Sequence, residues 1–271
     1  MTMKKNLVEY KTPPLIETVC SVQFEPLAGS IFQLGQFWQE VKDEFSVGKE
    51  QPPLMNIIEP EFLTPQFQSL SIQFDQSPRL FMTTTDQIFA LQVQRDRFIL
   101  NWRRTSDEAT YPRFVAIYPK FEGLFGKFRR FVEAQDLGSV VQNQFELTYV
   151  NIIDQKNGLE KTTSDKLFVD HMRDTKMAER FLPSPESLNW QSSFPLEDKM
   201  GRLHINASSA FLTQDPSRGQ VMRVDLTARG IGKDRTDAGR IGWFDVAHKW
   251  VVLGFADIIR LDIQQECWGR K

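Results

Sequence analysis

The sequence predicts an α+β protein in which antiparallel sheets carry helices on one face. Many short segments alternate apolar and polar residues, which is the pattern of half-buried antiparallel strands. A few longer segments repeat apolar residues every three or four positions, as amphipathic helices do. The composition, 41% hydrophobic and 25% charged in 271 residues, is that of an ordinary globular protein.

The first half of the chain predicts a strand, a helix, several strands and a long helix. The expected elements are a strand at 15–24, a helix at 31–45, a loop at 47–66, strands at 69–74, 79–85, 88–94 and 97–103, and a helix at 112–135. Ser30 is a suitable N-cap for the first helix. Four prolines define the loop, which could be a lid, an interface or an insertion. Pro119 is expected to kink or restart the long helix.

The segment 87–104 predicts a hairpin. Its large apolar residues occupy odd positions up to Val93 and even positions from Phe98, so the alternation changes at Arg95-Asp96. A tip at these two residues gives one apolar face, with the pairs Val93–Phe98, Leu91–Leu100 and Phe89–Trp102. The other face is rich in amides and arginines. A β-bulge is the alternative, because the tip lacks the glycine that a tight turn prefers.

A similar order of elements returns after residue 141, so we expect two halves, 1–141 and 142–271, fused into one globular unit. The expected elements are a strand at 144–154, a helix at 164–181, strands at 188–194, 201–211 and 220–229, and a final helix with apolar residues from Phe244 to Ile259. Duplication rests on element order alone. Halves joined edge to edge would form one continuous sheet with a concave face, which resembles in element order the TATA-binding-protein-like saddle and implies no function.

Charge and cysteine content argue against several classes of protein. The 33 basic and 35 acidic residues give a net charge of −2, so no overall field attracts nucleic acid or an anionic membrane. Cys20 and Cys267 lie far apart and predict free thiols in a reducing compartment. No segment approaches the ~18 apolar residues of a membrane span, and the first residues lack a signal-peptide core. We therefore expect a cytoplasmic protein.

Three motifs resemble a sporadically distributed bacterial protein family of unknown function. They are LIETVCSVQFEPL at 15–27, LQVQRDRFILNWR at 91–103 with YPRF at 111–114, and ELTYVNII at 146–153. The resemblance covers residues 1–155 well and the remainder loosely. It implies no activity and no catalytic or ligand-binding residues. The patchy distribution of the family implies an association with mobile or defence genes.

The chain lacks a recognisable catalytic or metal-binding motif. Its histidines, His171, His204 and His248, have no cysteine or histidine at metal-ligand spacing. The segment 230–233 lacks the glycine spacing of a phosphate-binding loop, and the G-x-S-x-G motif of hydrolases is absent. We therefore expect no cofactor and no metal.

The candidate functional residues lie on the polar face of the predicted sheet. Amides and arginines can read the hydrogen-bonding groups of a partner, whereas a simply solvated face is richer in Lys, Glu and Thr. The candidate partner-binding residues are Gln92, Gln94, Arg97, Asn101, Arg103, His204, Asn206 and Arg223. Of these, Gln92, Gln94, Asn101 and Arg103 should surround a shared, partly accessible groove. A solvated exterior and a structural role in tying down loops are the alternatives, and the proline-rich loop and Trp268 could cover part of the face.

Three functions follow from these observations. The first is a non-enzymatic binding protein that recognises a protein or peptide, as an immunity, antitoxin or adaptor component. The second is nucleic-acid binding on the concave face, which the near-neutral charge and the absence of a lysine-rich stripe disfavour. The third is an enzyme of unrecognised type, which a deep pocket with two coupled ionisable groups would support.

Overall fold

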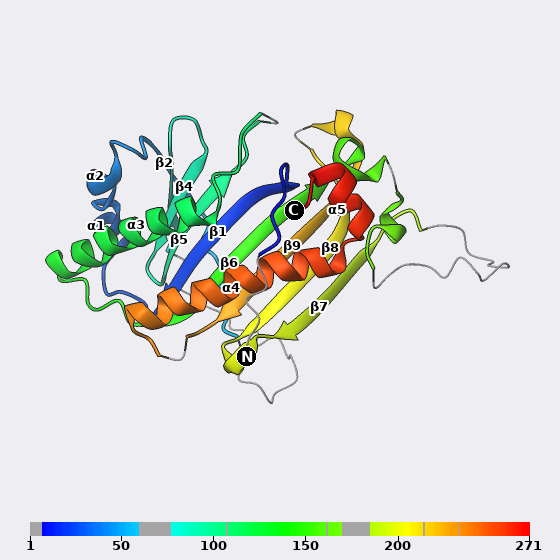
Figure 1. Cartoon of the computed structure of the whole chain (residues 1–271). Helices are drawn as coiled ribbons and strands as arrows, with labels where there is room; N and C mark the ends of the chain where they lie inside the picture. The colour runs from blue at the N-terminus through cyan, green and yellow to red at the C-terminus, as the bar shows by residue number, and fades with distance from the viewer. Residues whose placement is uncertain are drawn as a thin grey trace, which may run out of the picture.

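The computed structural model describes residues 7–59, 77–106, 108–160, 162–169, 185–213, 215–232 and 234–271. In these ranges the strands form one antiparallel nine-stranded sheet in the order β2-β3-β4-β5-β1-β6-β9-β8-β7 (Figure 1). The strands are β1 (Leu15–Phe24), β2 (Val47–Gln51), β3 (Arg79–Thr83), β4 (Phe89–Gln94), β5 (Arg97–Arg103), β6 (Gln142–Ile153), β7 (Asn189–Pro195), β8 (Arg202–Phe211) and β9 (Gln220–Gly230). The predicted strand at 69–74 lies outside the described residues.

Five α-helices belong to the described ranges: α1 (Ile31–Gly35), α2 (Trp38–Val41), α3 (Phe114–Ala134), α4 (Asp237–Ile258) and α5 (Leu261–Trp268). Short helical turns are η1 (Gln155–Leu159), η2 (Ser164–Lys166), η3 (Glu197–Lys199) and η4 (Pro216–Arg218). The predicted α+β class, with helices packed on one face of an antiparallel sheet, is confirmed. Most of the helix predicted at 164–181, including His171, lies outside the described residues.

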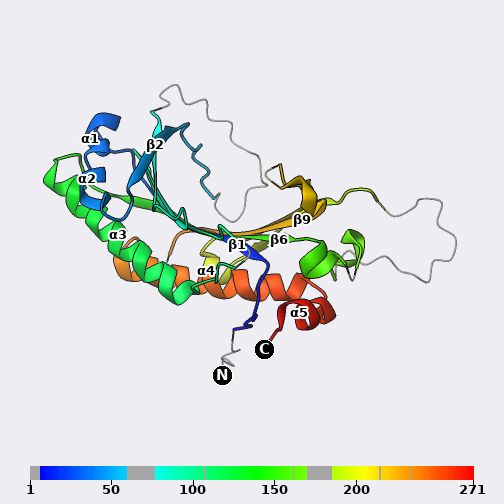
Figure 2. The same ribbon diagram turned by 90° about the horizontal axis from the view of Figure 1, so that it is seen from above.

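The two long helices lie on the same side of the sheet (Figures 1 and 2). Phe121 of α3 contacts Phe98 of β5 and Phe244 of α4, with ring centroids 5.9 and 5.5 Å apart. In each half the first strand pairs with the last, β1 with β5 and β6 with β9, and β1 pairs with β6 to join the halves. A duplication would produce this topology. The duplication and the saddle shape themselves stay predictions.

The hairpin of β4 and β5 has the predicted register. Phe89 lies opposite Trp102, Leu91 opposite Leu100 and Val93 opposite Phe98. Trp102 is 1% exposed. The tip needs no glycine because neither Arg95 nor Asp96 has positive φ. The end of β1 and the segment that follows it hydrogen-bond to these two residues. The Asp96 carbonyl accepts from the Phe24 N–H at 2.9 Å, and the Arg95 carbonyl accepts from the Leu27 N–H at 2.8 Å.

Two predicted helices differ from the structure at their interior. Ser30 caps α1 as expected, but the predicted helix at 31–45 divides after Gly35 into α1 and α2. The predicted restart at Pro119 is wrong, because α3 continues through it. Proline lacks the N–H that would donate to the carbonyl of Val115, and Val115 lies on the exposed side of the helix where water can satisfy that carbonyl.

Part of the predicted loop at 47–66 is regular. Residues Val47–Gln51 form β2, an edge strand that pairs with β3, and the chain from 52 to 59 has no regular structure. Residues 60–66 lie outside the described ranges. The prolines therefore mark the end of β2 rather than a loop that starts at Val47.

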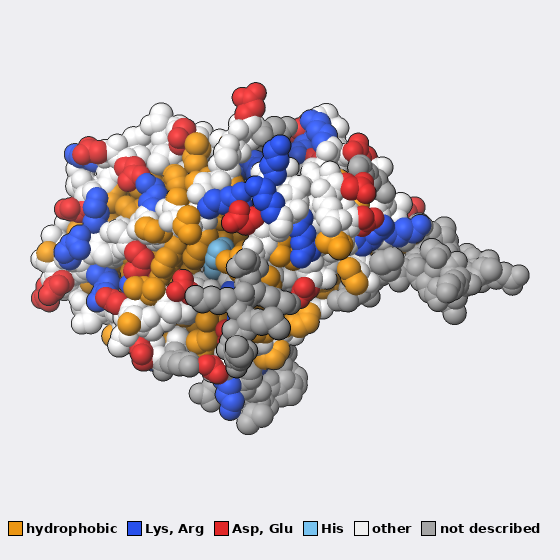
Figure 3. Space-filling model, in the orientation of Figure 1, with side chains coloured by type: hydrophobic (Ala, Val, Ile, Leu, Met, Phe, Trp, Pro, Cys, Tyr) orange, Lys and Arg blue, Asp and Glu red, His pale blue; other side chains and the backbone are white. Residues whose placement is uncertain are grey.

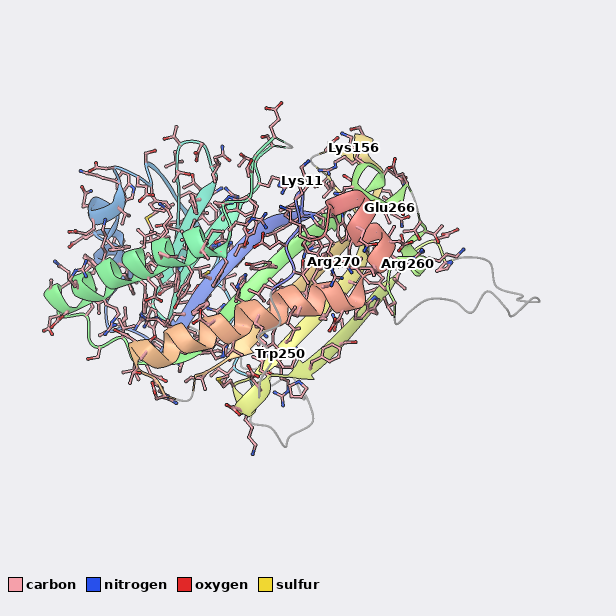
Figure 4. All side chains as sticks on the ribbon, viewed as in Figure 1. Lys11, Lys156, Trp250, Arg260, Glu266 and Arg270 are labelled. Atoms are coloured by element: carbon pink, nitrogen blue, oxygen red, sulfur yellow. The ribbon has the colours of Figure 1, made fainter. Side chains whose placement is uncertain are left out.

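Trp268 belongs to the helix side of the sheet, so the expectation that it could cover the polar face is wrong. It is fully buried, stacks on Phe255 and donates from its indole to the Asn157 carbonyl at 2.6 Å. Arg260, labelled in Figure 4, is the N-cap of α5, and Gly269 is its C-cap. The location of the Trp268 side chain is determined by apolar contacts in the core, which its place near the end of the sequence does not reveal.

Neither Cys20 nor Cys267 forms a disulfide, as predicted. Cys20 is buried in β1, and burial raises the pKa of its thiol. Among the described helices, none has the length and apolar character needed to span a membrane.

Candidate functional site

A short extended segment crosses the polar face of the sheet. We call this segment, residues 52–59, the strap. It follows β2 and lies on the side of the sheet opposite α3 and α4 (Figure 2). Its contacts begin at the end of β4, continue over β5 and β6, and end on β8. The strap therefore runs across the strands and connects the two halves of the sheet.

Two glutamines hold the strap by its main chain. Gln94 Oε1 accepts from the Leu54 N–H, and Gln94 Nε2 donates to the Leu54 carbonyl, both at 3.0 Å. Gln144 Oε1 accepts from the Glu59 N–H at 2.6 Å, and Gln144 Nε2 donates to the Ile57 carbonyl. A side-chain amide that pairs with one N–H and one C=O reproduces the hydrogen bonds of a neighbouring strand. These contacts therefore recognise an extended main chain whatever its side chains are.

The hairpin adds contacts to the middle of the strap. Arg97 Nη2 donates to the Met55 carbonyl at 3.1 Å, and Asn56 Nδ2 donates to Asp96 Oδ2 at 2.5 Å. The large apolar side chains of this stretch instead face solvent; they are Met55, Ile57 and Ile58. Main-chain and polar contacts, rather than burial of apolar side chains, therefore hold the strap to the sheet.

An ion-pair cluster holds the end of the strap on β8. The Glu59 carboxylate contacts Arg202 Nη1 at 2.5 Å and His204 Nε2 at 2.9 Å. His204 Nδ1 lies 2.8 Å from Ser193 Oγ, which orients the ring. Burial by itself raises the pKa of Glu59, but the hydrogen bonds from His204 and Arg202 outweigh it and the pKa is lowered. Glu59 is therefore held as a carboxylate.

A polar cavity of about 210 Å³ lies beside the strap, and we call it the arginine cavity. It is lined by Glu17, Val19, Leu54, Arg79, Phe81, Ala90, Gln92, Arg97, Ile99, Asn101, Arg103 and Glu146. Within the described ranges, the Nε atoms of its three arginines are buried without a hydrogen-bond partner. Burial lowers the pKa of Arg97, and it lowers the pKa of Arg79 together with the nearby charge of Arg97.

The structure brings six of the eight predicted site residues together. Gln94, Arg97 and His204 contact the strap, and Gln92, Asn101 and Arg103 line the arginine cavity with Arg97. Asn206 and Arg223 do not join them. Asn206 Oδ1 is buried without a partner among the described residues, and Arg223 pairs with Asp225 at 2.9 Å.

The expectation that the hairpin residues are accessible is wrong for Gln92, Gln94 and Asn101. They are 7%, 7% and 8% exposed, because the strap and the neighbouring side chains cover them. Sequence reasoning also missed Gln144, which holds the strap from β6. Its alternation with Glu146 on the polar side of that strand is the signal that could have identified it.

A second cavity, of about 230 Å³, lies on the helix side between α3, α4 and the N-terminal segment. Figure 3 shows hydrophobic side chains gathered across this side of the molecule. The Tyr111 and Tyr149 hydroxyls lie 2.8 Å apart in its wall, and the His248 ring stacks on Phe114 at 4.2 Å. Burial raises the pKa of Tyr111 to about 12 and lowers that of His248 to about 4, so both are neutral near pH 7. The cavity has the character of a site for an uncharged group.

This cavity does not strengthen the enzyme hypothesis. The two tyrosines hydrogen-bond each other, but among the described residues no base hydrogen-bonds to either hydroxyl, and the His248 ring packs against the rings of Phe114 and Tyr149. A general base acts from within hydrogen-bond reach of the proton that it takes, directly or through one water. Arg113 at the start of α3 has a φ of 74°, a strained value for a residue with a side chain, and donates to the Tyr10 carbonyl at 3.0 Å. This hydrogen bond joins the N-terminal segment to the start of α3 beside the cavity.

The comparisons with known proteins give no relative from which a function could be transferred. No protein-family model matches the chain, and no curated protein sequence is significantly similar to it. The functional argument therefore depends on the geometry of the polar face.

Proposed function

We propose that this is a binding protein whose polar sheet face recognises an extended peptide segment of a partner protein. The observation that carries the proposal is the pairing of Gln94 and Gln144 with the main chain of the strap. The strap occupies the position that a partner segment takes. Recognition of an extended main chain is a recurring mode of peptide binding. An adaptor, immunity or antitoxin component would use such a face.

The chemistry of the face supports a peptide more than a nucleic acid. Gln94 and Gln144 each offer one donor and one acceptor, which is the complement of a peptide unit and not of a phosphate. The same face carries the carboxylates of Glu17, Asp96 and Glu146 among its arginines, so it lacks the uniformly basic surface that a phosphate backbone favours.

The proposal is tested by supplying the strap as a separate peptide. Residues 52–59 are replaced in the full chain by a Gly-Ser segment of equal length, and a fluorescent peptide with the sequence of residues 51–59, QPPLMNIIE, is added. Fluorescence anisotropy should show saturable binding to the strap-replaced protein and much weaker binding to the natural chain, whose face is occupied. Gln94→Ala and Gln144→Ala should weaken the binding, because each removes two main-chain contacts.

Arg223→Ala is the matched control, because Arg223 lies on the same sheet and makes its ion pair with Asp225, away from the strap. It should leave peptide binding unchanged. A strap-replaced protein that melts cooperatively and fails to bind the peptide would overturn the proposal. Binding that is insensitive to both glutamine substitutions would overturn it as well. Tighter binding of a single-stranded oligonucleotide than of the peptide would favour the nucleic-acid alternative.

A further inference from the structure

We infer that the arginine cavity is a carboxylate-binding pocket that selects partner peptides with an acidic side chain at the position of Leu54. The inference rests on the proposed function and assigns it a side-chain preference. Leu54 lines the cavity while its own main chain is held by Gln94. A partner segment bound in the same way places its corresponding side chain in the same cavity.

The cavity places three arginines beside two carboxylates, Glu17 and Glu146, so its positive charge is only partly balanced. Arg79 comes from β3, and Arg97 and Arg103 come from β5. The Nε atom of each is buried without a hydrogen-bond partner in the described part of the chain, and the whole Arg97 residue is 9% exposed. A buried N–H without an acceptor is unfavourable, so the cavity favours a guest that supplies acceptor atoms.

The two carboxylates in the cavity wall already have other partners. Glu17 Oε1 accepts from Asn101 Nδ2 at 2.8 Å, and Glu146 Oε2 accepts from Arg229 Nε at 2.7 Å. Neither accepts a hydrogen bond from the three cavity arginines in the described structure. Among the described residues no acceptor hydrogen-bonds to the Nε atoms of these three arginines, so an acceptor on a bound molecule would satisfy them.

The same hydrogen-bond chain leaves one acceptor for the guest main chain. A carboxylate only accepts, so Glu17 orients Asn101 with its NH₂ group toward Glu17. Asn101 Oδ1 then accepts from Gln92 Nε2 at 2.7 Å. Gln92 Oε1 is left buried without a partner among the described residues, although Gln92 lines the cavity. It can accept an N–H from the bound peptide.

A single carboxylate is the guest that fits these groups best. Its two oxygens suit guanidinium N–H groups, and charge-assisted hydrogen bonds of this kind are stronger than neutral ones. Leucine at position 54 supplies no acceptor, whereas glutamate has a side chain of similar length with two. The nearby Glu17 and Glu146 disfavour a doubly charged phosphate more than a singly charged carboxylate.

The test uses variants of the strap peptide on the strap-replaced protein. Four peptides carry Leu, Glu, Gln or phosphoserine at the position of Leu54 and are otherwise QPPLMNIIE. The Glu peptide should bind at least about tenfold more tightly than the Gln peptide, which has the same shape without the charge. Arg79→Gln and Arg103→Gln should remove this preference and leave binding of the Leu peptide almost unchanged. Arg223→Gln, outside the cavity, should retain the preference.

The possible outcomes separate the inference from the proposed function. Equal binding of the Glu and Gln peptides, with the Leu peptide still bound through Gln94, would overturn the inference alone. Tightest binding of the phosphoserine peptide would show that the cavity takes phosphate and would overturn the carboxylate assignment. Failure of all four peptides to bind a folded protein would overturn both.

A measurement on the intact chain does not depend on the strap replacement. Leu54→Glu should raise the melting temperature above that of Leu54→Gln at neutral pH, and the difference should shrink as salt is added. An equal or lower melting temperature for Leu54→Glu would contradict the inference. In the Arg103→Gln background, Leu54→Glu should no longer melt at a higher temperature than Leu54→Gln.

Discussion

Replacing Gln94 by alanine should release one end of the strap without unfolding the sheet. The side chain makes two hydrogen bonds to the Leu54 main chain at 3.0 Å and one to Asp96 Oδ1 at 2.6 Å. Each hydrogen bond contributes about 0.5–1.5 kcal/mol net. The two bonds to Leu54 therefore stabilise the docked strap by about 1–3 kcal/mol.

Hydrogen exchange at the Leu54 amide measures this quantity directly. In the natural chain this N–H donates to Gln94 Oε1, so it exchanges only when the strap opens. A loss of about 1–3 kcal/mol corresponds to exchange that is about 5- to 150-fold faster. The Glu59 amide, which donates to Gln144, should accelerate less because its own acceptor remains.

Gln92→Ala is the matched control for this experiment. Gln92 lies two residues earlier on the same face of β4, is equally buried and donates to Asn101 instead of the strap. It should leave exchange at Leu54 within about twofold of the natural rate while it lowers global stability by about 1–3 kcal/mol. Unchanged exchange at Leu54 in Gln94→Ala, or equal acceleration by both variants, would refute the assignment of Gln94 as the group that holds the strap.

Three further predictions concern the core and the turns. Trp102→Ala should cost about 3–5 kcal/mol in urea unfolding, because the indole is buried opposite Phe89, and a cost below ~1 kcal/mol would contradict that packing. The pKa of His248 falls from 6.5 to about 4 on folding, so the stability that neutral His248 provides is complete above pH 6.5 and is lost, by up to about 3 kcal/mol, as the pH falls toward 4. His248→Phe should flatten this part of the profile of unfolding free energy against pH, and an unchanged profile would exclude His248 as its cause. Gly201→Ala should cost at least about 1–3 kcal/mol, because φ at Gly201 is +129° and a Cβ would collide with the Arg229 carbonyl. Gly48→Ala is the control: its Cβ meets no atom within 4 Å, so it should be nearly neutral, and equal melting temperatures of the two variants would refute the prediction.

The local alternation of apolar and polar residues was sufficient to predict the hairpin and the strands around it. The change of parity at Arg95-Asp96 determines which residues pair, since a slip by one residue would turn every apolar side chain to the polar face. Interior helix breaks were less predictable. The division after Gly35 and the continuity through Pro119 depend on tertiary packing and on hydration of one carbonyl, which periodicity does not report.

The candidate site was predictable only as a face. Parity places Gln92, Gln94 and Asn101 on one side of the hairpin, and the structure confirms that placement. The strap that covers them comes from a proline-rich segment about 40 residues away along the chain, as the bond between Leu54 and Gln94 shows. No local sequence pattern predicts that contact, because Gln94 and Gln144 bind the main chain of the strap, and main-chain contacts do not require particular side chains.

A tethered strap sets a quantitative requirement for any partner. A segment joined to the sheet through β2 competes at an effective concentration of about 1 mM, the value typical of short flexible linkers. A partner present at about 1 μM must therefore bind about 10³-fold more tightly than the strap, which corresponds to about 4 kcal/mol. Main-chain pairing with Gln94 and Gln144 cannot provide this difference, since the strap and the partner make it equally. A carboxylate in the arginine cavity supplies about 1.5–3 kcal/mol per charge-assisted hydrogen bond, so two such bonds supply about 3–6 kcal/mol, a range that contains the requirement, where Leu54 supplies none.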